Sequence, residues 1–222
     1  LFIMGLRMTG TVIGWWVYLL TGSPLALGLV GLSEVIPAVS LALYAGQHID
    51  RSEKRSLLLR CILMYTGCIL FLWLLSSGTA SMHLSPWTIC LIIFAVIAIT
   101  GAIRSFSGPT FSSLIAQIVP REILPAAASI SSATWLVASI SGHAAGGFLI
   151  AGIGIQNTFL VILLQVCAGY FILSRLKPKE VLVSGKANTW SRVKEGLQYV
   201  FHSKELLGAM SLDLFAVLFG GA

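Results

Sequence analysis

Five ionisable side chains lie inside long apolar stretches of the sequence, where a charge is costly. They are Arg7, Glu34, Arg104, His143 and Asp213. Such groups in a membrane-spanning segment line a pathway, carry protons, or pair with one another. The chemistry that they offer is therefore the binding of a cargo or the exchange of a proton.

Glu34 is the candidate best placed to carry a proton. It precedes Gly46 by 12 residues, which puts it about 18 Å from the inner end of a helix, and no basic residue is near it in the sequence. Desolvation favours the protonated carboxyl group there. Glu34 either exchanges a proton along a cavity or forms a structural hydrogen bond to a neighbouring helix.

The other four candidates have competing interpretations. We expect Arg7 to extend to the inner membrane interface, as long basic side chains near helix ends do. Asp213 occupies a similar place in a later apolar stretch, so the two could face each other. For Arg104 we expect a pairing with Asp50, and the alternative is a cation that attracts an anionic cargo. His143 titrates near neutrality, but its small neighbours favour a packing role.

Several common motifs of nucleotide-binding and catalytic sites are missing from the sequence. It contains no Gly-x-x-x-x-Gly-Lys-Ser/Thr phosphate loop, no His-Glu-x-x-His and no Gly-x-Ser-x-Gly. We expect no enzyme, no cofactor and no metal site. A membrane-embedded enzyme or assembly factor would need inward-facing catalytic groups, and a channel is a further alternative.

Composition identifies the medium that surrounds the chain. Of its 222 residues, 57% are hydrophobic and 10% are charged, and the mean hydropathy is +0.93. Soluble domains carry about 25% charged residues, so this surface is built for lipid. The net charge of +6 does not indicate nucleic-acid binding, because the basic residues lie between the apolar runs.

The apolar runs have the length that a membrane-spanning helix needs. We predict an all-α, polytopic transmembrane helical bundle with spans over residues 1–21, 25–49, 57–77, 87–106 (continuing as helix to about 118), 123–151 and 158–173. A seventh span begins near residue 206. Residues 1–176 form a six-helix bundle, 177–204 a cytoplasmic linker with an amphipathic helix, and 205–222 a truncated start of a second bundle.

The positions of the cations predict the orientation. Twelve of the 14 Lys and Arg residues, all except Arg7 and Arg104, lie in or beside the links after the second, fourth and sixth spans: Arg51, Lys54, Arg55, Arg60, Arg121, Arg175, Lys177, Lys179, Lys186, Arg192, Lys194 and Lys204. Cytoplasmic links carry the excess of Lys and Arg. We therefore expect a multi-pass protein of the inner (cytoplasmic) membrane with a cytoplasmic N-terminus.

The link after the second span carries a family resemblance. Gly46, Asp50, Arg51, Lys54 and Arg55 resemble the loop signature of the major facilitator superfamily, at the same place between the second and third spans. The glycine would permit close helix approach, and Asp50 could hold cations or the positive end of a helix. Glu53 stands where the signature has glycine, and it could pair with either of the two basic residues that follow it.

Two further segments extend the resemblance. Gly142, His143, Gly146 and Gly147 resemble the superfamily's antiporter signature in the fifth span, with His143 in place of proline, and the glycines would pack helices closely. The segment from Leu20 to Pro24 is similar to the branch that contains bacterial enterobactin and macrolide exporters.

The resemblance implies a secondary active transporter that works by alternating access, with cargo bound near the midplane between two halves. We expect export of a siderophore-like or drug-like small molecule, with multidrug or macrolide efflux as the alternative. The expected partners are the cargo, membrane lipid and a coupling ion, of which the proton is the simplest, and the full-length protein would be a monomer. The chain itself is expected to be the N-terminal half of a longer protein.

Overall fold

The computed structural model describes residues 1–77, 84–176, 202–203, 207–208 and 211–212. Contacts divide the chain into two units, Leu1–Leu182 and Val183–Ala222. Every element described below belongs to the first unit. Asp213, most of the predicted linker and most of the predicted seventh span lie outside the described residues.

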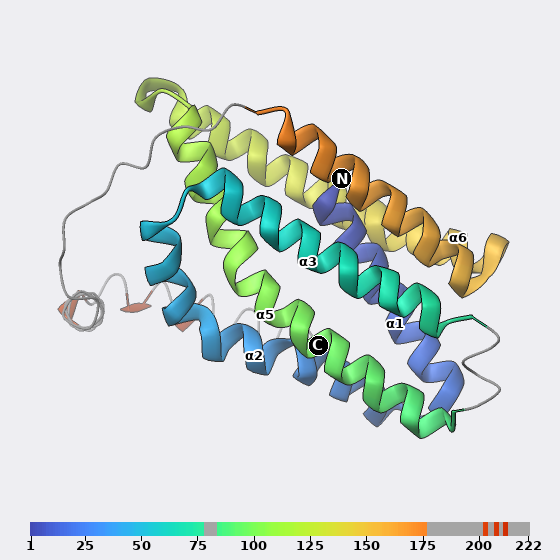
Figure 1. Cartoon of the computed structure of the whole chain (residues 1–222). Helices are drawn as coiled ribbons and strands as arrows, with labels where there is room; N and C mark the ends of the chain where they lie inside the picture. The colour runs from blue at the N-terminus through green and yellow to red at the C-terminus, as the bar shows by residue number, and fades with distance from the viewer. Residues whose placement is uncertain (78–83, 177–201, 204–206, 209–210, 213–222) are drawn as a thin grey trace. The chain divides into compact units, whose positions relative to one another are not determined.

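The first unit is built from long helices, and no strand occurs among the described residues (Figure 1). The helices are α1 (Phe2–Thr21), α2 (Pro24–Arg51), α3 (Lys54–Leu75), α5 (Pro86–Ile118) and α6 (Leu124–Ser174), and a short 3-10 helix, η1 (Arg121–Ile123), precedes α6. These five α-helices are long and apolar enough to cross a membrane. The prediction of an all-α transmembrane bundle is confirmed.

The longest element, α6, is interrupted at Gly154. Its backbone there has φ 79° and ψ 173°, which only glycine adopts readily. The side chains of Asn157 and Thr158 donate hydrogen bonds to the carbonyls of Ile153 and Gly154 at 3.0 and 2.7 Å. The chain doubles back at this point (Figure 1). The fifth and sixth predicted spans are therefore residues 124–153 and 155–174 of α6.

Sequence signals fix the other helix ends. Gly22 ends α1 in the left-handed conformation (φ 61°), and its N–H bonds to the carbonyl of Tyr18 at 2.8 Å. Pro24 then opens α2, at a position where its missing N–H costs nothing. The hydroxyl of Ser85 accepts from the N–H of Thr88 and caps α5.

The core forms around α1, which packs against both parts of α6. On one side Gly142 and Gly146 contact its backbone, and on the other Gly5 meets Ile162 and Val166. Further along, the rings of Trp16 and Phe159 meet edge to face with centroids 5.9 Å apart. Because the two parts of α6 run back on each other, α1 is held between them.

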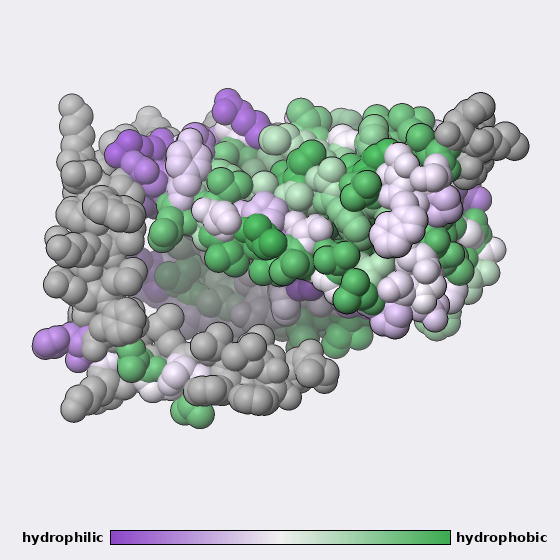
Figure 2. Space-filling model, turned by 90° about the horizontal axis from the view of Figure 1, so that it is seen from below, coloured by the Kyte–Doolittle hydropathy of each residue, from purple (hydrophilic) through white to green (hydrophobic). Residues whose placement is uncertain are grey.

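By contrast, α2 is covered mainly by α5. Among its side chains only Ala26, Ala45 and Ile49 are buried. Leu25, Val39 and Leu43 are more than 60% exposed, as suits a surface that faces lipid or a second bundle. Figure 2 shows an apolar middle region on one face of the molecule, with hydrophilic side chains gathered toward one end.

Candidate functional site

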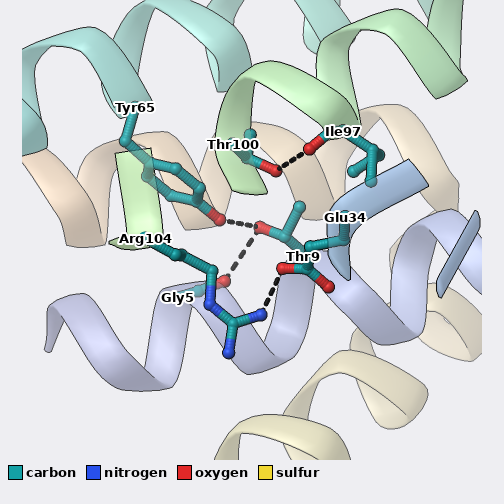
Figure 3. A network of polar contacts seen from close by, with 7 residues as sticks. All are labelled: Gly5, Thr9, Glu34, Tyr65, Ile97, Thr100 and Arg104. Atoms are coloured by element: carbon teal, nitrogen blue, oxygen red, sulfur yellow. Dashed lines mark hydrogen bonds and ion pairs between the residues drawn. The ribbon is translucent and has the colours of Figure 1, made fainter. Parts of the chain in front are cut away.

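An ion pair joins α2 to α5 within the spanning region. The guanidinium of Arg104 donates a hydrogen bond to the carboxylate of Glu34 (Figure 3). The two side chains are 37% and 30% exposed, so the pair is open to one side of the bundle. Among the described residues it is the only salt bridge.

Gly101 brings the two helices together at this pair. A Cβ atom at Gly101 would collide with the backbone carbonyl of Glu34. Gly101 precedes Arg104 by three residues, so both lie on the same face of α5. The missing side chain of Gly101 therefore allows α2 to approach closely enough for Arg104 to reach the carboxylate.

A layer of buried hydroxyl groups lies beside the pair (Figure 3). Tyr65 of α3 donates to Thr9 of α1 at 2.8 Å, and Thr9 donates to the carbonyl of Gly5 at 2.8 Å. Thr100 of α5 donates to the carbonyl of Ile97 at 2.8 Å. Each of these hydroxyls has a partner. The bond between Tyr65 and Thr9 links α3 to α1, whereas the other two bonds lie within single helices.

A second guanidinium lies close to the ion pair. Arg7 of α1 sits over the indole ring of Trp135, 4.9 Å from its centroid, and it interacts electrostatically with both Arg104 and Glu34. Trp135 belongs to α6 and is 45% exposed. The spanning region therefore holds one ion pair between α2 and α5 and a second guanidinium, from α1, that packs on an indole ring.

The structure corrects the expectation that Arg7 reaches the inner interface. Its neighbour Gly5 packs most closely against Val166, and Val166 precedes the end of α6 at Ser174 by 8 residues. At 1.5 Å per residue, Gly5 lies about 12 Å from that end and Arg7, two residues further along α1, about 15 Å. An arginine side chain cannot span this depth, and Arg7 instead packs on Trp135.

The expected pairing of Arg104 with Asp50 is also wrong. Arg104 pairs with Glu34, and Asp50 is exposed near the end of α2 with no ion pair among the described residues. Asp50 follows Glu34 by 16 residues on the same helix, a rise of about 24 Å. One side chain of α5 could not bond to both carboxylates.

His143 forms a hydrogen bond to α1. Its Nδ1 lies 2.9 Å from the hydroxyl of Thr11, which also lies 3.3 Å from the carbonyl of Arg7. The hydroxyl has one proton, so it donates to only one of these partners while the other contact depends on the tautomer of the ring. His143 is exposed and lies next to Gly142, where α6 meets α1.

Of the three glycines in the packing motif, two contact α1. A Cβ atom on Gly142 would lie 2.7 Å from the carbonyl oxygen of Met4, and one on Gly146 would lie 3.3 Å from the backbone of Met8. Among the described residues, nothing lies within 4 Å of a Cβ atom added at Gly147. Close packing of this motif therefore occurs at Gly142 and Gly146 in the described part of the chain, and for Gly147 it stays a prediction.

The loop between α2 and α3 is organised by Glu53, the residue that departs from the family signature. Its carboxylate accepts from the N–H groups of Arg55 and Ser56 at 3.0 and 2.6 Å, and so caps α3. Lys54 is buried and donates to the carbonyls of Ile49 and Ser52. Glu53 thus binds backbone donors, whereas the sequence predicted a pairing with a basic side chain.

The remaining motif residues lie around this cap. Arg55 donates to the carbonyl of Ser174 at 2.6 Å, which brings the start of α3 to the end of α6. Arg51 is exposed. Gly46 has nothing within 4 Å of an added Cβ atom, so the expected close helix approach does not occur there among the described residues.

Comparison with known proteins adds to this geometry. The family model described as transmembrane secretion effector matches residues 3–221. The chain belongs to this family of the major facilitator superfamily. It is also 23% identical over 199 residues to an uncharacterized MFS-type transporter, YkuC, of Bacillus subtilis (strain 168).

The alignment with YkuC covers 84% of this chain and 44% of YkuC, so the chain spans less than half the length of that relative. No solved structure matches the chain significantly. Membership of this superfamily agrees with the multi-pass helical bundle and with the resemblance seen in the α2–α3 loop.

Several residues of the site gave no signal in the sequence. Thr9, Tyr65 and Gly101 have ordinary types for an apolar helix, and only their neighbours in space give them a role. Trp135 lies under Arg7 in the structure, a contact that the sequence does not indicate. Gly101 precedes Arg104 by three residues, and this spacing could have suggested that a close helix contact lies beside the charged side chain.

Proposed function

We propose that the full-length protein is a secondary active transporter that exports a small molecule across the cytoplasmic membrane by alternating access. Family membership supports transport, and an ion gradient as the source of energy belongs to the proposal. The observation that carries the proposal is the partly exposed ion pair between Glu34 and Arg104 in the spanning region. A siderophore-like or a drug-like cargo fits this proposal, and the cytoplasmic N-terminus and monomeric state belong to it.

In this proposal the coupling ion is a proton, and Glu34 takes it up. The ionised carboxylate attracts Arg104 and holds α2 against α5. Protonation removes that attraction and leaves the packing of α2 on α5, in which only three side chains of α2 are buried. The charged or polar groups near Glu34 are Arg104 of α5, Arg7 of α1 and Tyr65 of α3. Cycles of protonation would then bias the two conformations that alternating access requires.

The test measures export in inverted membrane vesicles that contain the full-length protein. Radiolabelled 2,3-dihydroxybenzoylserine represents the siderophore-like cargo and erythromycin the drug-like cargo. We expect one of them to accumulate in energised vesicles, and a protonophore to abolish the accumulation. Accumulation that ignores the protonophore would exclude proton coupling, and accumulation of neither probe would argue against both cargo classes.

Variants of the pair separate coupling from structural support. Glu34→Gln mimics the protonated carboxyl group, and we expect it to abolish gradient-driven export while cargo binding stays nearly intact. The double variant Glu34→Gln with Arg104→Gln removes the unpaired guanidinium and should restore thermal stability without restoring export. If the double variant recovers export, the pair is structural and the proton carrier lies elsewhere.

A further inference from the structure

The charges gathered in the spanning region do not balance. Arg104 and Glu34 neutralise each other as an ion pair, which leaves the charge of Arg7 without a carboxylate among the described residues. The ring of Trp135 attracts Arg7 through its face, but a neutral ring does not cancel a charge. Among the described residues, the site therefore has more positive than negative charge.

The surroundings of Arg7 leave its guanidinium able to bind a ligand. Its side chain is half-buried, with Trp135 on one face of the guanidinium and Gly142 beside its Cβ. Thr11 and His143 meet one helical turn further along α1, where they add hydrogen-bonding groups of neutral or positive character. A guanidinium offers up to five N–H donors in a fixed planar array, which suits carboxylate, sulfonate and phosphate oxygens.

We infer that this cluster, which we call the Arg7 site (Arg7, Thr11, Trp135 and His143), binds an anionic group of the cargo, with an adjacent flat apolar group against Trp135. This inference rests on the proposed function and names the charge class of its cargo. A cationic cargo would meet repulsion from both Arg7 and Arg104, and the carboxylate of Glu34 is already engaged by Arg104. The Arg7 site thus discriminates by charge.

The test compares three probes of one shape and different charge. Equilibrium binding of 2-naphthoate, 2-naphthamide and 2-naphthylmethylammonium is measured on purified full-length protein in neutral detergent at neutral pH. We expect naphthoate to bind at least about tenfold more tightly than the amide, the size of one charge-assisted hydrogen bond, and the ammonium probe to bind weakest. Equal binding of the three, tighter binding of the ammonium probe, or no saturable binding of naphthoate would overturn the inference.

Two variants locate the effect. Arg7→Gln should abolish the preference for naphthoate over the amide, and Arg7→Lys should keep part of it. Arg60→Gln removes an exposed cation near the start of α3 and should leave the preference unchanged. A preference that survives in Arg7→Gln would contradict the assignment. The three-probe comparison on the unmodified protein decides the charge class even if Arg7→Gln fails to fold.

An anionic lipid headgroup could bind to the same groups as an anionic cargo, so a competition experiment distinguishes the two ligands. Naphthoate binding is repeated with phosphatidylglycerol or with phosphatidylcholine added to the micelles. Displacement by phosphatidylglycerol alone would show that the site is a lipid site and would overturn the assignment to cargo. Binding in detergent needs no transport, so a protein that binds naphthoate but exports nothing would refute the proposed function and leave the charge preference standing.

Discussion

At the scale of single residues, ionisable groups in this protein are held by two kinds of partner. Within the spanning region the guanidinium of Arg104 has a carboxylate and that of Arg7 has an indole ring. At the α2–α3 loop, Glu53 and Lys54 bind backbone groups that the helix ends leave free. The first kind faces an open side and can respond to a ligand, whereas the second kind stabilises a helix junction.

The cap of α3 gives a stability prediction. Glu53→Ala removes the acceptor for two backbone N–H groups, so the free energy of unfolding should fall by about 1 kcal/mol. Thermal unfolding followed by size-exclusion chromatography in detergent measures the change. Glu122→Ala, which removes an exposed carboxylate of η1, is the matched control and should leave the midpoint unchanged. Equal midpoints for both variants would contradict the capping role.

Asp50 gives a prediction about transport. We expect Asp50→Asn to lower transport strongly while the protein still inserts and still binds cargo, because this exposed carboxylate biases a conformational equilibrium and does not contact cargo. Initial rates of export and equilibrium binding are measured on the same preparation. Transport at the unmodified rate would remove Asp50 from the mechanism.

At the scale of helices, glycines decide which elements approach closely. Gly142 and Gly146 bring the first part of α6 to α1, and Gly101 brings α5 to α2. Lipid offers little hydrophobic drive for helix association, so close backbone packing of this kind supplies much of the attraction. The two contacts hold the helices that carry Arg7 and the ion pair.

Substitution by alanine is predicted to affect stability differently at two glycines of the packing motif. Gly142→Ala places a methyl group 2.7 Å from the carbonyl oxygen of Met4 and should cost about 1 to 3 kcal/mol of stability. Gly147→Ala enters open space within a helix and should be neutral or slightly stabilising. Thermal unfolding of the two variants in the same detergent distinguishes them, and an equal loss in both would show that the α1–α6 contact is misassigned.

Gly101 is predicted to act through the ion pair. Gly101→Ala should push α2 away from α5 and lower the unfolding midpoint, whereas Gly67→Ala, in open space on α3, should not. If the close approach at Gly101 is needed for the ion pair, Gly101→Ala should lower the midpoint less in a protein that already carries Arg104→Gln. The reason is that the two changes then disrupt one contact. Additive effects of the two substitutions would separate the glycine from the pair.

At the scale of the whole molecule, the links after α2, α5 and α6 all carry exposed basic side chains. Arg51, Arg121 and Arg175 are exposed there, and Arg55 at the start of α3 bonds to Ser174 at the end of α6. Hydrophilic side chains gather toward one end in Figure 2. The opposite turn at Gly154 carries no basic residue between Gly152 and Asn157.

This asymmetry gives the prediction about orientation. In a variant whose four free cysteines are replaced, a new cysteine at Gln156 should react with an impermeant thiol reagent in intact cells. A cysteine at Glu122 should react only after permeabilisation. Labelling at Glu122 in intact cells would reverse the proposed orientation.

The sequence by itself was sufficient to predict the membrane bundle, the boundaries of its spans to within a few residues, and the superfamily. Each of these depends on local properties: the length of an apolar run, the glycine or proline beside it, and the charges between runs. The orientation inferred from the Lys and Arg residues depends on their positions in the sequence and not on their neighbours in space. Asp213 and the linker lie outside the described residues, so their roles stay predictions.

Only the tertiary structure decided which charges meet. The pairing of Arg104 with Glu34, the stacking of Arg7 on Trp135 and the different roles of Gly142 and Gly147 all depend on how each helix is rotated about its axis. In a soluble helix the apolar stripe reveals that rotation. In lipid both the packed face and the outer face are apolar, so the sequence holds no such stripe, and the rotation is set by close packing between helices.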